Sequence, residues 1–426
     1  MTSLHNPDPD PSQIAYPGSE TVANGTSSSS PDDLERDDYS ANQRGWRRIV
    51  LNFTPAWFTV NMGTGITSIL LHNLPYNGRW LYWISVIIFC LNILLFLSFL
   101  SISILRYSMF RGVFSETLRT PSQAVYLGTI PMGLATIINM IVFVCVPAWG
   151  DRAAVLAWAL WWIDAAIAMA CNFCVPHAIM RTRGVSLSSM NASLLLPIVA
   201  DIVASATGAI VANVLPNQQH AIWTVIFSYI LWGTGVPMAL VILTMYYNRL
   251  MFHDVPPKEV IVSCFIPLGP LGQGAAGIQL LGQVALKLFT ENDFIPRAPI
   301  AGQFFYVAGI MLALIMWGFG LVWMFFALAT IYRRKFPFNL SWWAFTFPLG
   351  VYTVATTTLA QELPSLFFKV LGTIFSVIET CLWMMVALGT IKYALNGRLF
   401  KPPPTASWAE KSKVYPDQDS PAIALK

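Results

Sequence analysis

Charged side chains are scarce in this chain of 426 residues. Asp, Glu, Lys and Arg make up 11% of it, whereas a soluble globular protein carries about 25%. Hydrophobic residues make up 55%. This balance excludes an ordinary soluble domain and predicts an all-α membrane protein. The net charge is only +4 and the basic residues stand in short loops, which argues against nucleic-acid binding.

Groups suited to catalysis or metal binding are also few. The cysteines all fall inside apolar stretches, so we interpret them as small buried thiols. Cys171 and Cys174 have the spacing of a redox motif, but they lack the strand context that such a motif needs. No nucleophile with an acid–base partner assembles from the apolar stretches. We therefore expect no enzyme, no cofactor and no metal site. The cysteines are Cys90, Cys145, Cys171, Cys174, Cys264 and Cys381.

Both ends of the chain are polar. Residues 1–45 contain serine and acidic runs and no apolar core of a signal peptide, so we predict a disordered cytoplasmic tail. Residues 399–426 are polar and proline-rich and form a second predicted cytoplasmic tail. A membrane domain is predicted between them, over residues 46–398.

Ten apolar spans stand between the tails. Most Lys and Arg residues of the connecting loops fall on one side, which by the positive-inside rule places both termini in the cytoplasm. The chain is thus predicted to cross the lipid bilayer many times. The spans are roughly 51–72, 80–105, 121–146, 152–176, 190–214, 220–248, 259–287, 299–332, 341–361 and 364–394.

Every odd-numbered span carries a proline, and short sequences around three of them resemble one another: IPMGLAT, IPLGPLG and FPLGVYT. Proline removes a backbone donor and is expected to kink each of these helices. Even-numbered spans are rich in Trp, Phe and Leu. The repeat predicts five helical hairpins with pseudo-five-fold symmetry, the kinked helices forming an inner ring around a central pore. The prolines are Pro55, Pro131, Pro197, Pro267 and Pro348.

Small and polar residues on the odd spans are the candidates for lining this pore. No Lys or Arg stands in the middle of an odd span, which favours weak binding and rapid passage of small anions. For each residue the alternative is close helix packing, which small side chains also permit. The candidates are Asn61, Gly63, Thr64, Thr129, Gly133, Asp201, Ser205, Gly269, Gln273, Gly350 and Thr353.

Three acidic residues lie inside predicted spans. Asp201 follows Pro197 by four residues on an inner helix, so it is the candidate for coupling transport to protons. Asp164 and Glu379 lie on outer helices, where helix-to-helix hydrogen bonds or subunit contacts are expected.

Phe347 stands beside Pro348 in a ring of helices that is otherwise rich in small residues. A hydrophobic ring in a narrow pore excludes water and can block the passage of an anion. We therefore predict that Phe347 is the constriction. The alternative is that its ring only packs between helices.

Several blocks of sequence resemble the tellurite-resistance/dicarboxylate transporter family. That family includes the plant guard-cell slow anion channels, the fungal sulfite efflux pumps, to which the resemblance is greatest, and the yeast malic acid transporter. The resemblance covers about residues 50–395. The blocks are PAWFTVNMGTGITSILLHNLPY at 55–76, IPMGLATIINM at 130–140, WWID at 161–164, LGPLGQGAAG at 268–277, WWAFTFPLG at 342–350 and VLGTIF at 370–375.

The resemblance implies ten helices in five hairpins, a central pore and a homotrimer of separate pores. A phenylalanine on the ninth helix plugs the pore in the anion channels. By position in the motif this role falls to Phe347, with Phe345 as the second candidate. The expected function is plasma-membrane export of sulfite as the hydrogen sulfite anion. A C4-dicarboxylate (malate) carrier and an uncoupled gated anion channel remain as alternatives.

Overall fold

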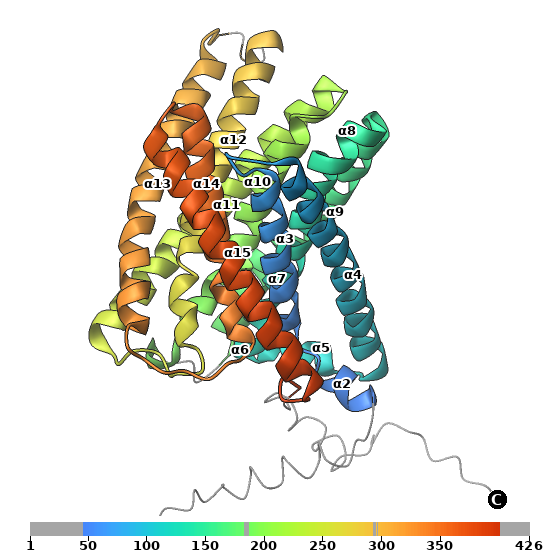
Figure 1. Ribbon diagram of the computed structural model, residues 1–426, viewed down its shortest axis with the longest axis vertical. Helices are drawn as coiled ribbons and strands as arrows, with labels where there is room; N and C mark the ends of the chain where they lie inside the picture. The colour runs from blue at the N-terminus through green and yellow to red at the C-terminus, as the bar shows by residue number, and fades with distance from the viewer. Residues whose placement is uncertain (1–45, 183–186, 293–294, 296, 401–426) are drawn as a thin grey trace, which may run out of the picture. The chain divides into compact units, whose positions relative to one another are not determined.

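The computed structural model describes residues 46–182, 187–292, 295 and 297–400. The predicted N-terminal tail, and the predicted C-terminal tail from residue 401 onward, lie outside these residues. Every regular element in the described part of the chain is a helix. In Figure 1 the long helices lie side by side and run roughly along the vertical axis. The short helices α2 (Trp46–Asn52), α5 (Val113–Arg119) and α6 (Pro121–Ala124) lie at the lower end (Figure 1).

Eight helical segments of the described residues are long and apolar enough to cross a membrane. They correspond to eight of the ten predicted spans, the first and ninth being the exceptions. Three of them combine several elements, because short 3-10 or π stretches interrupt the α-helix. The segments are α4 (Arg79–Met109), Pro121–Trp149, α9 (Asp151–Met180), Ala192–Ala212, α11 (Gln218–Phe252), Ile261–Thr290, α13 (Ala301–Ile331) and α15 (Leu366–Leu395).

The first and ninth predicted spans contain shorter α-helices. These are α3 (Phe58–His72), with 15 residues, and α14 (Thr346–Glu362), with 17 residues. At 1.5 Å per residue they extend about 22–26 Å, less than the hydrocarbon thickness of about 30 Å. Each is preceded by a 3-10 helix that lengthens the segment, η1 (Pro55–Trp57) and η7 (Leu340–Ala344).

Four of the five prolines of the odd spans stand where a 3-10 helix changes to α-helix, and the fifth, Pro55, opens the 3-10 helix itself. In addition to η1 and η7, such 3-10 helices are η2 (Val125–Gly128) before α7 (Thr129–Met140), η5 (Ala192–Leu195) before α10 (Leu196–Ala212), and η6 (Ile261–Phe265) before α12 (Leu268–Asn292).

Pro131 and Pro348 are the third residues of α7 and α14, and Pro197 is the second residue of α10. Pro267 directly precedes α12, and Pro55 opens η1. The first turn has no intrahelical acceptor for backbone N–H groups, so a proline there costs little. Where the sequence suggested a kink within a span, the structure has a change of helix type at its start.

Five helices form a closed ring, and we call them the inner helices: α3, α7, α10, α12 and α14. Each contacts the next one in this order, and α14 contacts α3. The outer helices α4, α9, α11, α13 and α15 each pack on the inner helix that precedes them in the chain. The spans that contain α7, α10 and α12 are 72–100% buried over their most apolar part, against 22–39% for the outer helices. One face of each outer helix is therefore left for lipid.

The inner helices approach one another closely where glycine allows it. A Cβ atom added to Gly272 of α12 would lie 2.6 Å from the backbone of Tyr352 on α14. No larger residue fits there without moving a helix. Close backbone contact of this kind is the usual role of small residues between membrane helices.

The expectation that all cysteines are buried was wrong. Cys145 and Cys264 are buried, but Cys90, Cys174 and Cys381 are exposed. These three lie on outer helices, whose outward faces are apolar because they meet lipid and not because they form the core.

Candidate functional site

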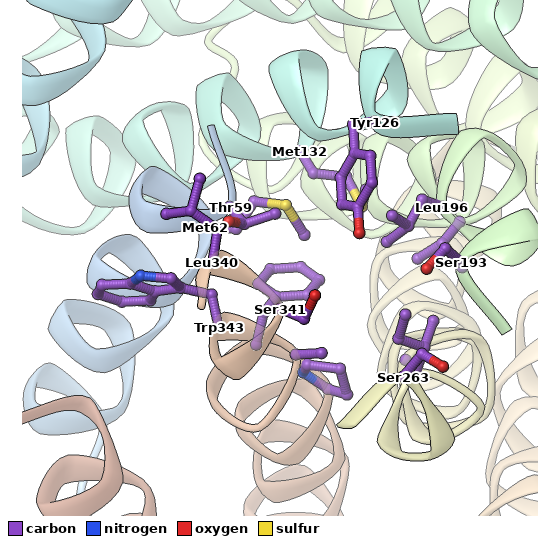
Figure 2. Close-up of a pocket in the computed structure, with 16 residues that line it drawn as sticks. Thr59, Met62, Tyr126, Met132, Ser193, Leu196, Ser263, Leu340, Ser341 and Trp343 are labelled. Atoms are coloured by element: carbon purple, nitrogen blue, oxygen red, sulfur yellow. The ribbon is translucent and has the colours of Figure 1, made fainter. Parts of the chain in front are cut away.

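A narrow cavity of about 30 Å³ lies inside the ring, at the N-terminal ends of all five inner helices (Figure 2). We call it the N-terminal cavity. Its lining comes from four of the 3-10 helices, η2, η5, η6 and η7, and from the first turns of the five inner helices. Apolar side chains, among them Met62, Met132, Val199 and Phe347, form much of the wall.

A wider cavity of about 370 Å³ is lined by the C-terminal parts of the same five helices. We call it the C-terminal cavity. Side-chain amides are prominent in its wall, and none of the residues assigned to it is charged. The amide residues are Asn73, Asn139, Asn213, Gln273, Gln283 and Gln361.

Only a short stretch of each helix separates the two cavities. On α3 the lining passes from Met62 to Ile66, and on α10 from Val199 to Ala206. The intervals on α7, α12 and α14 are similar. Four to seven residues correspond to about 6–10 Å along a helix. One cavity is lined by helix starts and the other by helix ends, so all five inner helices run in the same direction around them.

The two aromatic candidates for a gate occupy different surroundings. Phe347 lies in the first turn of α14, is 3% exposed and lines the N-terminal cavity. Phe345 is also buried but is not part of that wall. Its ring packs edge-on against Phe265, with 4.9 Å between ring centroids, and near Trp342. Of the two rings, only that of Phe347 can obstruct the N-terminal cavity by this geometry.

Two of the predicted pore-lining residues lie in the cavity walls, Gly269 in the N-terminal and Gln273 in the C-terminal cavity. Others bond to outer helices instead. The Ser205 hydroxyl donates to the Ser228 carbonyl on α11 at 2.7 Å. The Thr64 hydroxyl accepts from the Trp383 indole on α15 at 3.2 Å.

Asn61 also faces an outer helix, since its amide donates to the Asn92 side chain on α4 at 3.2 Å. The Thr129 hydroxyl donates to the Tyr126 carbonyl at 2.6 Å, and that of Thr353 to the Leu349 carbonyl at 2.8 Å. Buried polar groups need partners, and here either an outer helix or the residue's own segment supplies them.

The three predicted glycines outside the cavity walls lie against neighbouring side chains. A Cβ atom on Gly63 would meet Thr346 and Trp343, and one on Gly350 would meet Ile66, all at less than 3 Å. The nearest neighbour of a Cβ on Gly133 would be Asn61 at 3.2 Å. The structure therefore places these glycines at helix contacts.

The buried carboxyl group of Asp201 points from α10 toward two outer helices. Its Oδ2 atom accepts from the Asn172 amide of α9 at 2.5 Å and from the Thr234 hydroxyl of α11 at 2.9 Å. On α15, Glu379 Oε1 accepts from the Thr67 hydroxyl of α3 at 2.9 Å, which is the helix-to-helix hydrogen bond expected of it. Asp164 is fully buried, and its carboxylate oxygens have no hydrogen-bond partner within the described part of the chain.

Hydroxyl groups in the wall of the N-terminal cavity were not found from the sequence. Ser193 and Ser263 each stand four residues before the proline of their span, and this spacing is the signal that could have identified them. A second signal is the pattern Asn-x-Ser, which occurs at 191–193 and at 339–341.

Comparison with known protein families assigns this helical membrane protein to a family. Residues 52–391 match the SLAC1 family, described as voltage-dependent anion channels. The chain belongs to this family. Members of this family are described as anion channels and efflux pumps, which are membrane transport proteins and not enzymes.

Named relatives include sulfite efflux pumps. The chain is 50% identical to the sulfite efflux pump SSU1 of Arthroderma benhamiae, over 86% of this chain and 95% of the relative. It is 30% identical to the pump of the same name from Candida albicans, over 82% and 75%. The malic acid transport protein of Schizosaccharomyces pombe is 20% identical, over 88% of each chain.

Proposed function

We propose that this protein exports sulfite, as the hydrogen sulfite anion, through a pore enclosed by the inner helices. The observation that carries the proposal is that all five inner helices line two cavities from opposite ends, with a short closed stretch between. A path that needs only a small movement to open is typical of a gated pore.

The proposed architecture is ten membrane-spanning helices in five hairpins with pseudo-five-fold symmetry. It counts α3 and α14 as spanning when their 3-10 helices are included. Its support is that each inner segment repeats one order, a 3-10 helix followed by an α-helix, and then packs against its own outer helix.

The proposed gate is the Phe347 ring. An anion that passes an apolar ring must lose part of its hydration, at a cost of several kcal/mol. Rotation of the ring away from Met62 and Met132 would lower that barrier without any charged switch. Gly269 and Gln273 are the proposed pore-lining residues on either side of the closed stretch.

The choice of substrate rests on the relatives and on the charge of the path. The sulfite efflux pump of Arthroderma benhamiae is 50% identical to this chain, whereas the malic acid transport protein is 20% identical. Neither cavity has Lys or Arg in its wall, which suits a weakly bound monovalent anion better than a dianion. A C4-dicarboxylate carrier and an uncoupled anion channel are the alternatives.

Further parts of the proposal concern coupling, assembly and location. Asp201 is proposed to exchange a proton during transport, because it is a fully buried acid within an inner helix. Assembly as a homotrimer, residence in the plasma membrane and cytoplasmic termini are proposed from the family resemblance and the loop charges.

The test is growth on sulfite of a yeast strain that lacks its own exporter, with and without this chain. Gly269→Leu is a matched loss-of-function variant, because a Cβ there meets only Val199, at 3.9 Å, and the larger side chain can fill the N-terminal cavity. Gly318→Leu on α13 is the control, since open space surrounds that glycine.

We expect resistance to sulfite from the wild type and from Gly318→Leu, and sensitivity from Gly269→Leu at equal surface expression. Uptake of labelled malate in the same strains distinguishes the main alternative. Malate transport without sulfite resistance would contradict the proposed substrate.

A further inference from the structure

Five hydroxyl-bearing side chains surround the N-terminal cavity, and each comes from a different inner segment. We call them the hydroxyl ring. Figure 2 shows Tyr126, Ser193, Ser263 and Ser341 approaching the cavity from separate elements. The members are Thr59, Tyr126, Ser193, Ser263 and Ser341.

Two of these serines are held in place by equivalent caps. The Asn191 side-chain carbonyl accepts from the Ser193 backbone N–H at 2.9 Å, and that of Asn339 accepts from the Ser341 N–H at 2.8 Å. Such caps fix the start of a helix and therefore the direction of the first side chains. The Tyr126 hydroxyl lies close to the hydroxyls of both serines. Three hydroxyl groups thus meet in one region of the wall.

Ser263 carries the observation that points to a ligand. The residue is 3% exposed and lines the cavity, yet its hydroxyl has no hydrogen-bond partner among the described residues. An unpaired buried hydroxyl destabilises a folded protein, so such groups are usually bound to something. The Thr59 hydroxyl, by contrast, already donates to the Ala56 carbonyl at 2.6 Å.

The electrostatic surroundings of the cavity favour a negatively charged ligand. All five inner segments start here, so the positive ends of their helix dipoles converge on the cavity. No acidic residue belongs to its wall to oppose them. With no Lys or Arg there either, the attraction is moderate, as rapid passage requires.

From these observations we propose that the hydroxyl ring binds a small oxyanion on the N-terminal side of Phe347. Sulfite, with several acceptor oxygens on one sulfur, fits hydroxyl donors that converge from several directions. A cavity of about 30 Å³ has little room for a four-carbon dicarboxylate. This inference rests on the proposed function and adds to it the site that recognises the substrate.

The experiment compares purified protein in liposomes before and after removal of the hydroxyls. The variants are the double change Ser193→Ala with Ser263→Ala, and Tyr126→Phe. The control is Ser68→Ala, because that buried hydroxyl donates to the Ser85 carbonyl at 2.8 Å, away from both cavities. The measurements are the rate of sulfite efflux against sulfite concentration, and the rise in melting temperature that sulfite causes.

We expect the half-saturating sulfite concentration to rise about tenfold in the double variant, as for the loss of hydrogen bonds to a charged group. The sulfite concentration that gives half of the maximal rise in melting temperature should increase by the same factor. Tyr126→Phe should give a smaller shift, and Ser68→Ala none. The preference for sulfite over chloride should be smaller in the variants that lack these hydroxyls than in the wild type, because chloride has no directional acceptor geometry.

The outcomes separate this inference from the proposed function. Sulfite export by the wild type, with an unchanged concentration dependence in both variants, overturns the hydroxyl ring and leaves the exporter intact. A wild type that neither moves sulfite nor is stabilised by it overturns both.

Discussion

The N-terminal and C-terminal cavities are lined by the same five helices, yet they differ in size and in chemistry. The first holds about 30 Å³ and is walled by hydroxyls, methionines and Phe347, and the second holds about 370 Å³ and is walled by amides. The narrow cavity lies where the inner segments begin, four of them with 3-10 helix in its wall, and the wide cavity lies further along their α-helices.

Under the proposed function, this difference gives the two ends separate roles. The narrow end selects the anion, because hydroxyls and helix starts surround it. The wide end releases the anion, because amides around a larger volume contact a small anion one or two at a time. Residues that belong to the narrow end should therefore control rate and selectivity.

The largest expected effect comes from Phe347→Ala. Removal of a barrier of a few kcal/mol raises flux by about tenfold or more. Because the ring borders a cavity, we expect the free energy of unfolding to change little. Anion conductance of purified protein in a bilayer, together with its melting temperature, measures both.

Phe96→Ala is the matched control for that experiment. Phe96 is buried on α4 and packs edge-on against Phe58 at 5.7 Å between centroids, outside both cavities. Its removal should cost about 3–5 kcal/mol of stability and leave conductance unchanged. If Phe347→Ala behaves like Phe96→Ala, the ring is packing and the gate lies elsewhere.

An intermediate effect is expected for thiol accessibility. A cysteine at Gln273, in the wall of the C-terminal cavity, should react quickly with a small water-soluble reagent. A cysteine at Ser205 should react slowly, since that side chain faces Ser228 on α11. Both belong in a background without the exposed Cys90, Cys174 and Cys381. Equal rates at the two positions would remove the distinction between the cavity wall and the outer contacts.

The smallest effect is expected for Asp201→Asn. Its carboxylate accepts from Asn172 and Thr234 and faces neither cavity, so transport should persist. If Asp201 exchanges a proton during transport, sulfite efflux in the variant should depend less on pH than in the wild type. An unchanged pH profile at equal protein amount would remove Asp201 from the mechanism.

Much of the fold could be predicted from the sequence, because the recurring prolines and the alternation of small with bulky spans reflect the two layers. The ends of the helices could be predicted less well, because the sequence does not show where a 3-10 helix changes to α-helix. Phe347 could be singled out because it is the aromatic residue beside Pro348, and the structure places it in the wall of the N-terminal cavity. Its role as a gate stays a prediction. Ser205 and Thr64 show the limit: composition places them on an inner helix, but the side-chain direction depends on which neighbour supplies a hydrogen bond.

The central claim is that the two cavities belong to one path and that Phe347 separates them. The direct test is labelling of a cysteine at Gln273 from the N-terminal side, in sealed vesicles of known orientation and with an impermeant reagent. We predict that this side gives almost no labelling unless Phe347→Ala is also present, and rapid labelling when it is. Labelling from that side that does not change with Phe347→Ala would contradict the account.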